Sequence, residues 1–139
     1  SVPWTSNSIR SVMLKFLWLF CIPWVPSSPT IEVESQWGWQ TDRWKPVVEE
    51  VLEDYGIPDQ VDAFMRVMHC ESRGDPDAYN VSSGASGLMQ HLQYYWQDRA
   101  DAIGMSDATP FNPIANIYAS AWLLTTAGGG WVHWTCYGL

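Results

Sequence analysis

The chain has 139 residues, which is enough for one domain with a hydrophobic core and too few for two ordinary domains. Its formal net charge is −8, and the acidic excess lies within residues 41–139. An acidic domain repels nucleic-acid phosphates and is not drawn to an anionic membrane surface, so the composition argues against both partners and favours a neutral or zwitterionic polymer.

The first 25 residues contain an apolar run, Phe16–Ile22, which follows the basic residues Arg10 and Lys15. This run is too short to span a bilayer, since spanning takes roughly 20 apolar residues. We interpret residues 1–25 as a signal peptide, and the alternative is an apolar arm or anchor. We therefore expect a monomer that is secreted or held in the cell envelope, with membrane contact only through this segment if it stays uncleaved.

Residues 26–40 are rich in proline, serine and threonine and poor in large aliphatic side chains, a composition that predicts a linker. The folded domain is expected to comprise residues 41–139. Within it, apolar side chains recur at helical spacing from Trp44 to Tyr55, with Pro46 in the first turn. Gly56 and the following Ile-Pro pair should end this first helix.

A second helix is predicted from Asp59 or Gln60 to about residue 73, where Gly74 and Pro76 end it. Its apolar positions cover a broad face, so the helix should be largely buried: Val61, Phe64, Met65, Val67, Met68 and Cys70. Glu71 therefore lies at the C-terminal end of a buried helix.

Two further helices are predicted at Gln90–Ile103 and Pro113–Thr126. Asn112 caps the second one, and three glycines from Gly128 end it. The sequence shows no convincing strand pattern and no internal repeat. The predicted fold class is therefore all-α.

Two short segments carry the strongest functional signal. The run from His69 to Pro76, with Glu71-Ser72 inside it, is followed by Gly84-Ala85-Ser86-Gly87-Leu88-Met89-Gln90. This arrangement resembles the soluble lytic transglycosylases and other lysozyme-like enzymes, especially small relatives of the secreted actinobacterial or phage type with a tryptophan-rich ending. A phage-encoded or virion-associated protein is therefore an alternative to a secreted or envelope protein. The resemblance extends from Trp44 to Cys136 and includes Asn112-Pro113 and Asn116-Ile117. It implies a lysozyme-like domain that cleaves the MurNAc–GlcNAc β-1,4 bond of bacterial peptidoglycan, with no metal or organic cofactor.

Glu71 is the candidate catalytic residue. Cleavage of a glycosidic bond needs a protonated acid at the leaving oxygen, and an apolar setting or a helix C-terminus raises the pKa of a carboxyl group. No second acid occupies an obvious partner position. The resemblance implies that one glutamate suffices, because the substrate's own groups complete the reaction and leave a 1,6-anhydromuramoyl end. The alternatives are a lysozyme-type hydrolase, a non-catalytic peptidoglycan-binding module and an interaction protein that binds no glycan, in which Glu71 is an ordinary solvated glutamate.

The resemblance also suggests substrate contacts in the cleft that faces the catalytic acid. Gln90 offers an amide for sugar hydroxyl or N-acetyl groups, the small residues before it allow close backbone approach, and Met89 would form an apolar wall. The alternative is that this segment has no functional role and is only a turn that precedes a helix. The complete set of candidate substrate-binding residues is Ser72, Gly87, Met89, Gln90, Asn116 and Tyr118. For Asn116 and Tyr118, packing in the core is an equal alternative.

Cys70 and Cys136 are the only cysteines outside the N-terminal segment. An even pair in an exported domain suggests a disulfide, which would stabilise the domain by about 4 kcal/mol on the chain-entropy estimate. The alternative is a zinc site built from His69, Cys70, His133 and Cys136. It is disfavoured because neighbouring residues on a helix point about 100° apart and cannot easily bind one ion.

Overall fold

The structure is a computed structural model that describes residues 23–29, 34–126 and 128–139. The compact unit runs from Glu34 to Leu139. Residues 23–29 are exposed and form no helix or strand, and the apolar run predicted as part of a signal peptide, Phe16–Ile22, lies outside the described residues. Within the described part of the chain, no helix is long and apolar enough to cross a membrane.

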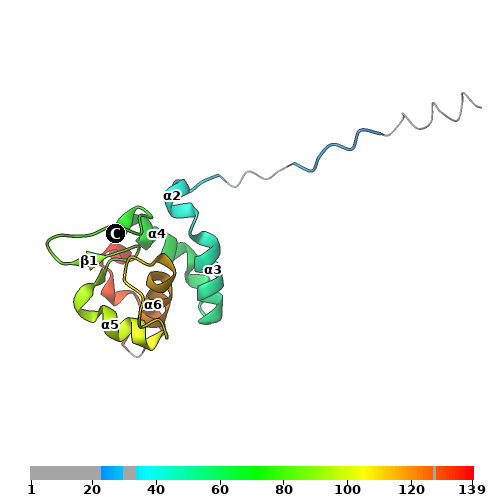
Figure 1. The fold of residues 1–139 in the computed structure, drawn as a ribbon. Coiled ribbons are helices and arrows are strands. Elements are labelled where there is room, and N and C mark those ends of the chain that lie inside the picture. Colours follow the sequence, from blue (N-terminus) through cyan, green and yellow to red (C-terminus); the bar gives the residue numbers. More distant parts are fainter. Residues whose placement is uncertain (1–22, 30–33, 127) are drawn as a thin grey trace, which may run out of the picture. The chain divides into compact units, whose positions relative to one another are not determined.

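The compact unit is mostly helical, as predicted, and Figure 1 shows the arrangement of its elements. Its α-helices are α2 (Trp39–Asp42), α3 (Lys45–Asp54), α4 (Val61–Ser72), α5 (Gln93–Ala102) and α6 (Pro113–Thr125). Three 3₁₀ turns accompany them, namely η1 (Pro58–Gln60), η2 (Trp131–His133) and η3 (Thr135–Gly138). Two short strands, β1 (Ala85–Ser86) and β2 (His91–Leu92), pair antiparallel.

The observed helices agree with the predicted ones except at the start of α5. That helix begins at Gln93 and not at Gln90, because Gln90 has a left-handed backbone (φ 53°) and the next two residues form β2. The β1–β2 hairpin was not predicted, because strands of two residues are too short to show an alternation of apolar and polar side chains. The compact unit also contains a helix, α2, which starts in the span 26–40 that composition predicts as a linker and ends inside the predicted domain.

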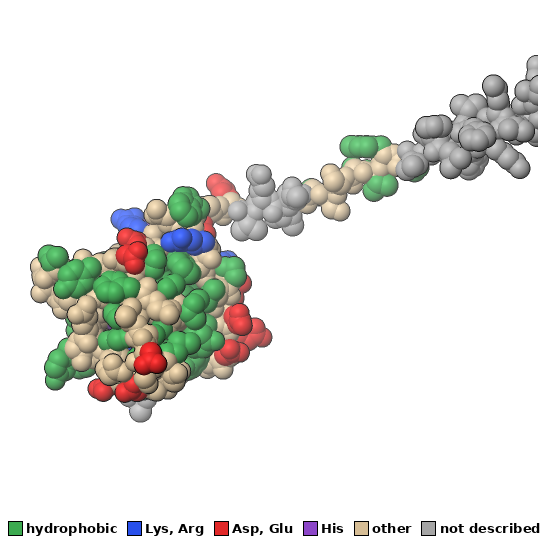
Figure 2. Space-filling model, viewed as in Figure 1, with side chains coloured by type: hydrophobic (Ala, Val, Ile, Leu, Met, Phe, Trp, Pro, Cys, Tyr) green, Lys and Arg blue, Asp and Glu red, His purple; other side chains and the backbone are tan. Residues whose placement is uncertain are grey.

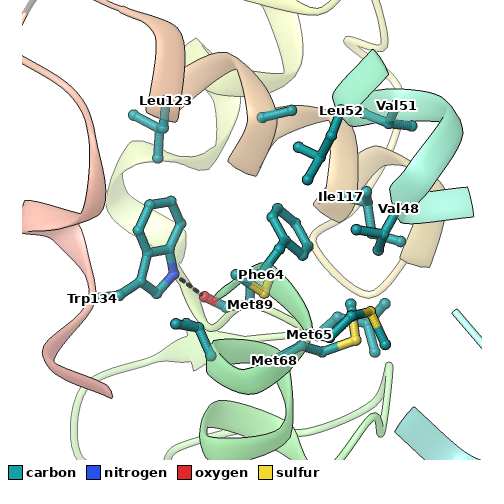
Figure 3. Close-up of a cluster of buried hydrophobic side chains, with 13 residues drawn as sticks. Val48, Val51, Leu52, Phe64, Met65, Met68, Met89, Ile117, Leu123 and Trp134 are labelled. Atoms are coloured by element: carbon teal, nitrogen blue, oxygen red, sulfur yellow. Dashed lines mark hydrogen bonds between the residues drawn. The ribbon is translucent and has the colours of Figure 1, made fainter. Parts of the chain in front are cut away.

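The main core lies between α3, α4 and α6. Helix α6 packs against α3 on one side and α5 on the other (Figure 1). Figure 3 shows the buried side chains that fill the space between these helices, among them Leu52 of α3, Phe64 and Met68 of α4, and Ile117 of α6, all fully buried. Burial of each such side chain contributes about 1.5–3 kcal/mol, so this core holds the end of α4 in a fixed position.

Helix α6 begins as the sequence predicts. The Asn112 side-chain oxygen accepts from the backbone amides of Ile114 and Ala115 at 3.1 and 3.2 Å, with Pro113 at the first helical position. A second, smaller cluster centred on Trp96 joins α5 to α6 through buried alanines. Their small side chains let the two helices approach closely.

Candidate active site

Glu71 lies in the last turn of α4, at the point where the chain leaves the helix. Arg73 closes the helix with a left-handed backbone (φ 56°), and Gly74 continues in the same region (φ 74°). The Ser72 hydroxyl donates to the Met68 carbonyl and accepts from the Gly74 amide, each at 3.2 Å. Ser72 is buried, so this predicted substrate-binding residue has its hydroxyl engaged within the turn behind Glu71.

The Glu71 carboxyl group is half-buried. Removal from water raises its pKa above the usual range of a glutamate, and a backbone hydrogen bond from Cys136 acts in the opposite direction with a smaller effect. The raised pKa agrees with the expectation for a general acid, and it arises from burial in the folded structure. The partner amide belongs to the C-terminal segment, which therefore forms one wall of the site.

The predicted Cys70–Cys136 disulfide is present, and it joins α4 to η3 with a Cα–Cα distance of 6.0 Å. Both sulfurs of the alternative zinc site are thereby bonded to each other. Its histidine ligand on α4, His69, is also engaged, since Arg73 Nη1 donates to its Nε2 and its Nδ1 contacts Thr41 Oγ1, both at 2.9 Å. Across the described residues, no group of three or more His, Cys, Asp or Glu side chains is placed to hold a metal ion.

The segment from Gly84 to Gln90, which we call the Gly84–Gln90 loop, is hydrogen-bonded to the buried side chain of Asn116 on α6. The Asn116 side chain is fully buried; its amide nitrogen donates to the Ser86 carbonyl at 3.2 Å and the Pro110 carbonyl at 2.8 Å. Its oxygen accepts from the Met89 amide at 2.9 Å. All its hydrogen-bonding groups thus face protein, so Asn116 positions the loop from inside.

Met89 and Gln90 occupy different environments within the loop. The Met89 side chain is fully buried, and its carbonyl accepts from Trp134 Nε1 at 2.9 Å (Figure 3). Gln90 is half-buried, and its amide nitrogen donates to the carbonyls of Ala78 and Gly87 at 3.2 and 3.0 Å. These bonds fix the Gln90 amide and leave its oxygen available as an acceptor.

His91 belongs to the buried scaffold of the loop, a role that the sequence does not signal. Its Nε2 donates to Ser120 Oγ at 2.8 Å, and Ser120 in turn donates to the Asn116 carbonyl at 2.8 Å. Arg99 Nη1 donates to His91 Nδ1 at 2.7 Å. Burial first, and the Arg99 charge second, lower the pKa of His91 to about 3, so the imidazole is neutral at physiological pH.

Tyr118 lies on α6 and packs against the main core. Its ring meets the Tyr55 ring of α3 edge-on at 6.3 Å between centroids. Burial, followed by the neighbouring Tyr118, raises the pKa of Tyr55. The observed contact of Tyr118 is thus a packing contact between two helices.

The C-terminal segment closes the domain over these elements. Trp131 Nε1 donates to Gln60 Oε1 at 2.8 Å, and the Trp131 ring stacks on Tyr137 at 4.9 Å between centroids. Together with the Trp134 hydrogen bond and the disulfide, these contacts fix the segment against α4 and the Gly84–Gln90 loop. The two segments that carry the sequence signal are therefore bridged by the chain's C-terminus.

A family model described as "Transglycosylase SLT domain" matches residues 47–136 of the chain. The match contains Glu71, the Gly84–Gln90 loop, Asn116 and both cysteines of the disulfide. No curated protein and no solved structure gives a significant match. Because the matched segment covers more than half of the chain and its helical fold agrees, the chain belongs to the transglycosylase SLT domain family, whose members are lytic transglycosylases that act on peptidoglycan.

Proposed function

We propose that Glu71 is the single acid/base of a lytic transglycosylase that cleaves the MurNAc–GlcNAc β-1,4 bond and leaves a 1,6-anhydromuramoyl end. The observation that carries this proposal is the half-buried Glu71 carboxyl group, whose pKa is raised by burial. A carboxyl group of this kind keeps its proton closer to neutral pH, as protonation of a glycosidic oxygen requires.

The reaction then needs two proton transfers by the same residue. Glu71 first gives its proton to the glycosidic oxygen, and the bond between that oxygen and C1 of MurNAc breaks. The resulting Glu71 carboxylate then takes the proton of the MurNAc 6-hydroxyl group, and the oxygen of that hydroxyl group attacks C1. No water is consumed, and Glu71 ends the cycle protonated, as it began.

The sequence around Glu71 favours a mechanism with one protein carboxylate. Glycoside hydrolases usually place a second carboxylate about 5–10 Å from the acid, as nucleophile or as base. The sequence offers no second acid at an obvious partner position to Glu71. A nucleophile supplied by the substrate removes the need for a second acid.

We assign direct substrate contact to Gln90 and a supporting role to Gly87. Gln90 keeps an acceptor oxygen, whereas Gly87 is buried against Asn116 and the Pro110 carbonyl. Met89, Asn116 and Ser72 are buried, so we assign them supporting roles. Each holds the loop or the helix end through the hydrogen bonds described above.

Peptidoglycan lies outside the cytoplasmic membrane, and the enzyme therefore acts in the cell envelope. We propose that the domain reaches this compartment by export as a monomer, with residues 1–25 as the signal peptide. The Cys70–Cys136 disulfide supports export, because disulfides persist in oxidising compartments and are rare in the cytosol.

The decisive experiment is mass spectrometry of the soluble fragments that the oxidised protein releases from purified peptidoglycan. Anhydromuramoyl ends that disappear in Glu71→Gln would establish the proposed reaction. The matched control is Glu53→Gln, which changes an exposed glutamate near the end of α3 and should keep full activity. Reducing ends would instead make the enzyme a hydrolase. A wild-type protein that binds peptidoglycan and releases nothing would be a binding module.

A further inference from the structure

A pair of tryptophans at the start of the compact unit forms a surface separate from the proposed catalytic site. Trp39 is 70% exposed, and Trp37 lies beside it across Gly38. With His69 and Arg73 of the α4 end they border a pocket of about 330 Å³. We call these four residues the tryptophan platform.

The exposed Trp39 ring packs against the side chain of Arg43. The Arg43 guanidinium carbon lies 5.4 Å from the Trp39 ring and 4.7 Å from the Trp44 ring, so the cation sits against both aromatic rings. Arg43 also donates to the carbonyls of Gln40 and Gly74 at 3.1 and 3.3 Å. Trp39 is thus exposed to solvent on a support that fixes its orientation.

The turn that carries Trp37 is equally constrained. Ser35 donates to the Asp42 carboxylate and accepts from the Gly38 amide at 2.9 Å, while the Trp37 amide contacts the same carboxylate at 3.4 Å. The Trp37 ring packs on His69 with 5.2 Å between centroids. Rigid aromatic side chains bind partners at low entropic cost, and an exposed aromatic surface held by this many contacts favours a binding role.

The platform lies on a different side of α4 from Glu71. His69 precedes Glu71 by two residues, so their side chains leave the helix about 200° apart. Helix α2 rests directly on the turn after Glu71, since a Cβ on Gly74 would come within 2.4 Å of the Gln40 carbonyl oxygen. Both tryptophans also precede residue 47, where the family match begins. The two tryptophans of the platform therefore lie outside the matched segment, and its His69 and Arg73 lie inside it.

The charge around the platform differs from that of the rest of the domain. Arg43, Lys45 and Arg73 make up three of the five Lys and Arg residues in 41–139, against thirteen acidic residues. On the face shown in Figure 2, the basic side chains lie at the α2 end beside exposed hydrophobic and some acidic ones, and further acidic side chains lie along α3. The arrangement fits a ligand that combines an apolar flat face with a negative group.

We propose that the tryptophan platform is a second, non-catalytic binding site for peptidoglycan strands. The apolar face of an N-acetylhexosamine ring stacks on Trp39, and a carboxylate of the attached stem peptide pairs with Arg73. This inference shares the peptidoglycan substrate with the proposed function and does not depend on the chemistry of Glu71. A second contact on the same polymer raises the effective concentration of the catalytic site at its substrate.

The test measures binding without turnover, in the Glu71→Gln background, by co-sedimentation with purified insoluble peptidoglycan. Trp39→Ala should weaken binding by about fivefold or more, the loss that truncation of an interface anchor produces. The matched control is Tyr94→Ala, which removes an aromatic side chain of 87% exposure from α5 and should leave binding within about twofold. Thermal unfolding checks that each variant is folded.

A second variant tests the carboxylate contact. Arg73→Gln keeps a long side chain and should weaken binding to intact peptidoglycan more than to glycan strands stripped of their stem peptides by an amidase.

Equal binding by Trp39→Ala and its parent would overturn the proposal, as would an equal loss in Tyr94→Ala. Dimerisation that depends on Trp39 would reassign the platform to self-association. Fragment release by wild type together with unchanged Trp39→Ala binding would refute the platform alone, whereas Trp39-dependent binding without any fragment release would refute only the catalytic proposal.

Discussion

Gly87 lies directly against Asn116. A Cβ on Gly87 would come within 2.4 Å of the Asn116 amide nitrogen and 2.1 Å of the Pro110 carbonyl oxygen, and the backbone there has φ +81°. The Gly84–Gln90 loop therefore sits on α6 by a contact between backbone and a buried amide, which a larger residue at position 87 does not allow.

Gly87→Ala should destabilise the domain by more than about 2 kcal/mol, because its methyl group must displace the Pro110 backbone or Asn116. The matched control is Gly84→Ala in the same loop. Its φ is +73° and its Cβ would meet nothing within 4 Å, so the left-handed backbone alone should cost about 1 kcal/mol. Urea unfolding measures both. Equal losses in the two variants would contradict the close approach at Gly87.

Asn116→Asp should destabilise by about 3 kcal/mol, since it replaces a donor of two hydrogen bonds with a carboxylate that faces the Ser86 and Pro110 carbonyls. Asn112→Asp is the same change at the N-cap of α6, where aspartate is a good cap, and should stay within about 0.5 kcal/mol. Chemical denaturation compares the two. Similar stabilities would show that the Asn116 amide does not hold the loop.

His91 should make the domain sensitive to acid. Its pKa is about 3 in the folded state and about 6.5 in an unfolded chain, so the unfolded state binds an additional proton between these values. Its contribution to stability is complete above pH 6.5 and falls by about 1.4 kcal/mol per pH unit as the pH drops toward 3. NMR of the imidazole should show no titration of His91 between pH 5 and 8.

The control for this pH effect is the exposed His133. His91→Gln should lower stability at pH 7 and flatten the decline between pH 7 and 5, while His133→Gln should keep the decline. Urea unfolding at both pH values provides the comparison. A decline that survives in His91→Gln would assign it to other groups.

Removal of the disulfide in Cys70→Ser/Cys136→Ser should destabilise the domain by about 4 kcal/mol, given the sequence separation of 66. Activity at a temperature where the variant stays folded should also fall, because the Cys136 backbone contacts Glu71. Thermal unfolding with and without a reductant, together with fragment release, measures both effects. A variant of unchanged stability would show that the bond adds nothing to the folded state.

Glu71 should make both activity and stability fall as the pH rises. Its pKa is raised, so kcat/KM should fall as the pH rises through that value and the general acid loses its proton. The charged form is also the destabilising one, so Glu71→Gln should be more stable than wild type at pH 7, by less than about 1 kcal/mol because the group is only half-buried, and equally stable at pH 3. A pH–rate profile and paired unfolding curves check the two signs.

Much of the fold could be predicted from the sequence because it depends on local patterns. Helical spacing and proline or glycine boundaries predicted α3, α4 and α6 to within a few residues, and two cysteines predicted the disulfide. The Gly84–Gln90 loop was found by its resemblance to a family. The hydrogen bonds by which Asn116 holds this loop could not be predicted, because they join Asn116 to Met89 and Ser86, which are 27 and 30 positions away in the sequence.

The tryptophan platform was missed for a related reason. Residues 34–40 are poor in large aliphatic side chains and therefore resemble a linker, yet Trp37 and Trp39 are fixed by an arginine, an aspartate and a serine at short range. Burial of His91 was equally hidden, since its partners Arg99 and Ser120 come from two helices that pack only in the folded domain. Such polar networks leave no periodic signal in a sequence.

Arg73 and Gln90 are the two non-glycine residues with a left-handed backbone among those that the structure describes; Arg73 ends α4, which carries Glu71, and Gln90 ends the Gly84–Gln90 loop. Glycine would fit both positions with less strain, so a selection experiment for thermostability alone should favour glycine there. Enzymes selected in this way would gain thermostability by losing the side chains of Arg73 and Gln90, which we propose bind peptidoglycan.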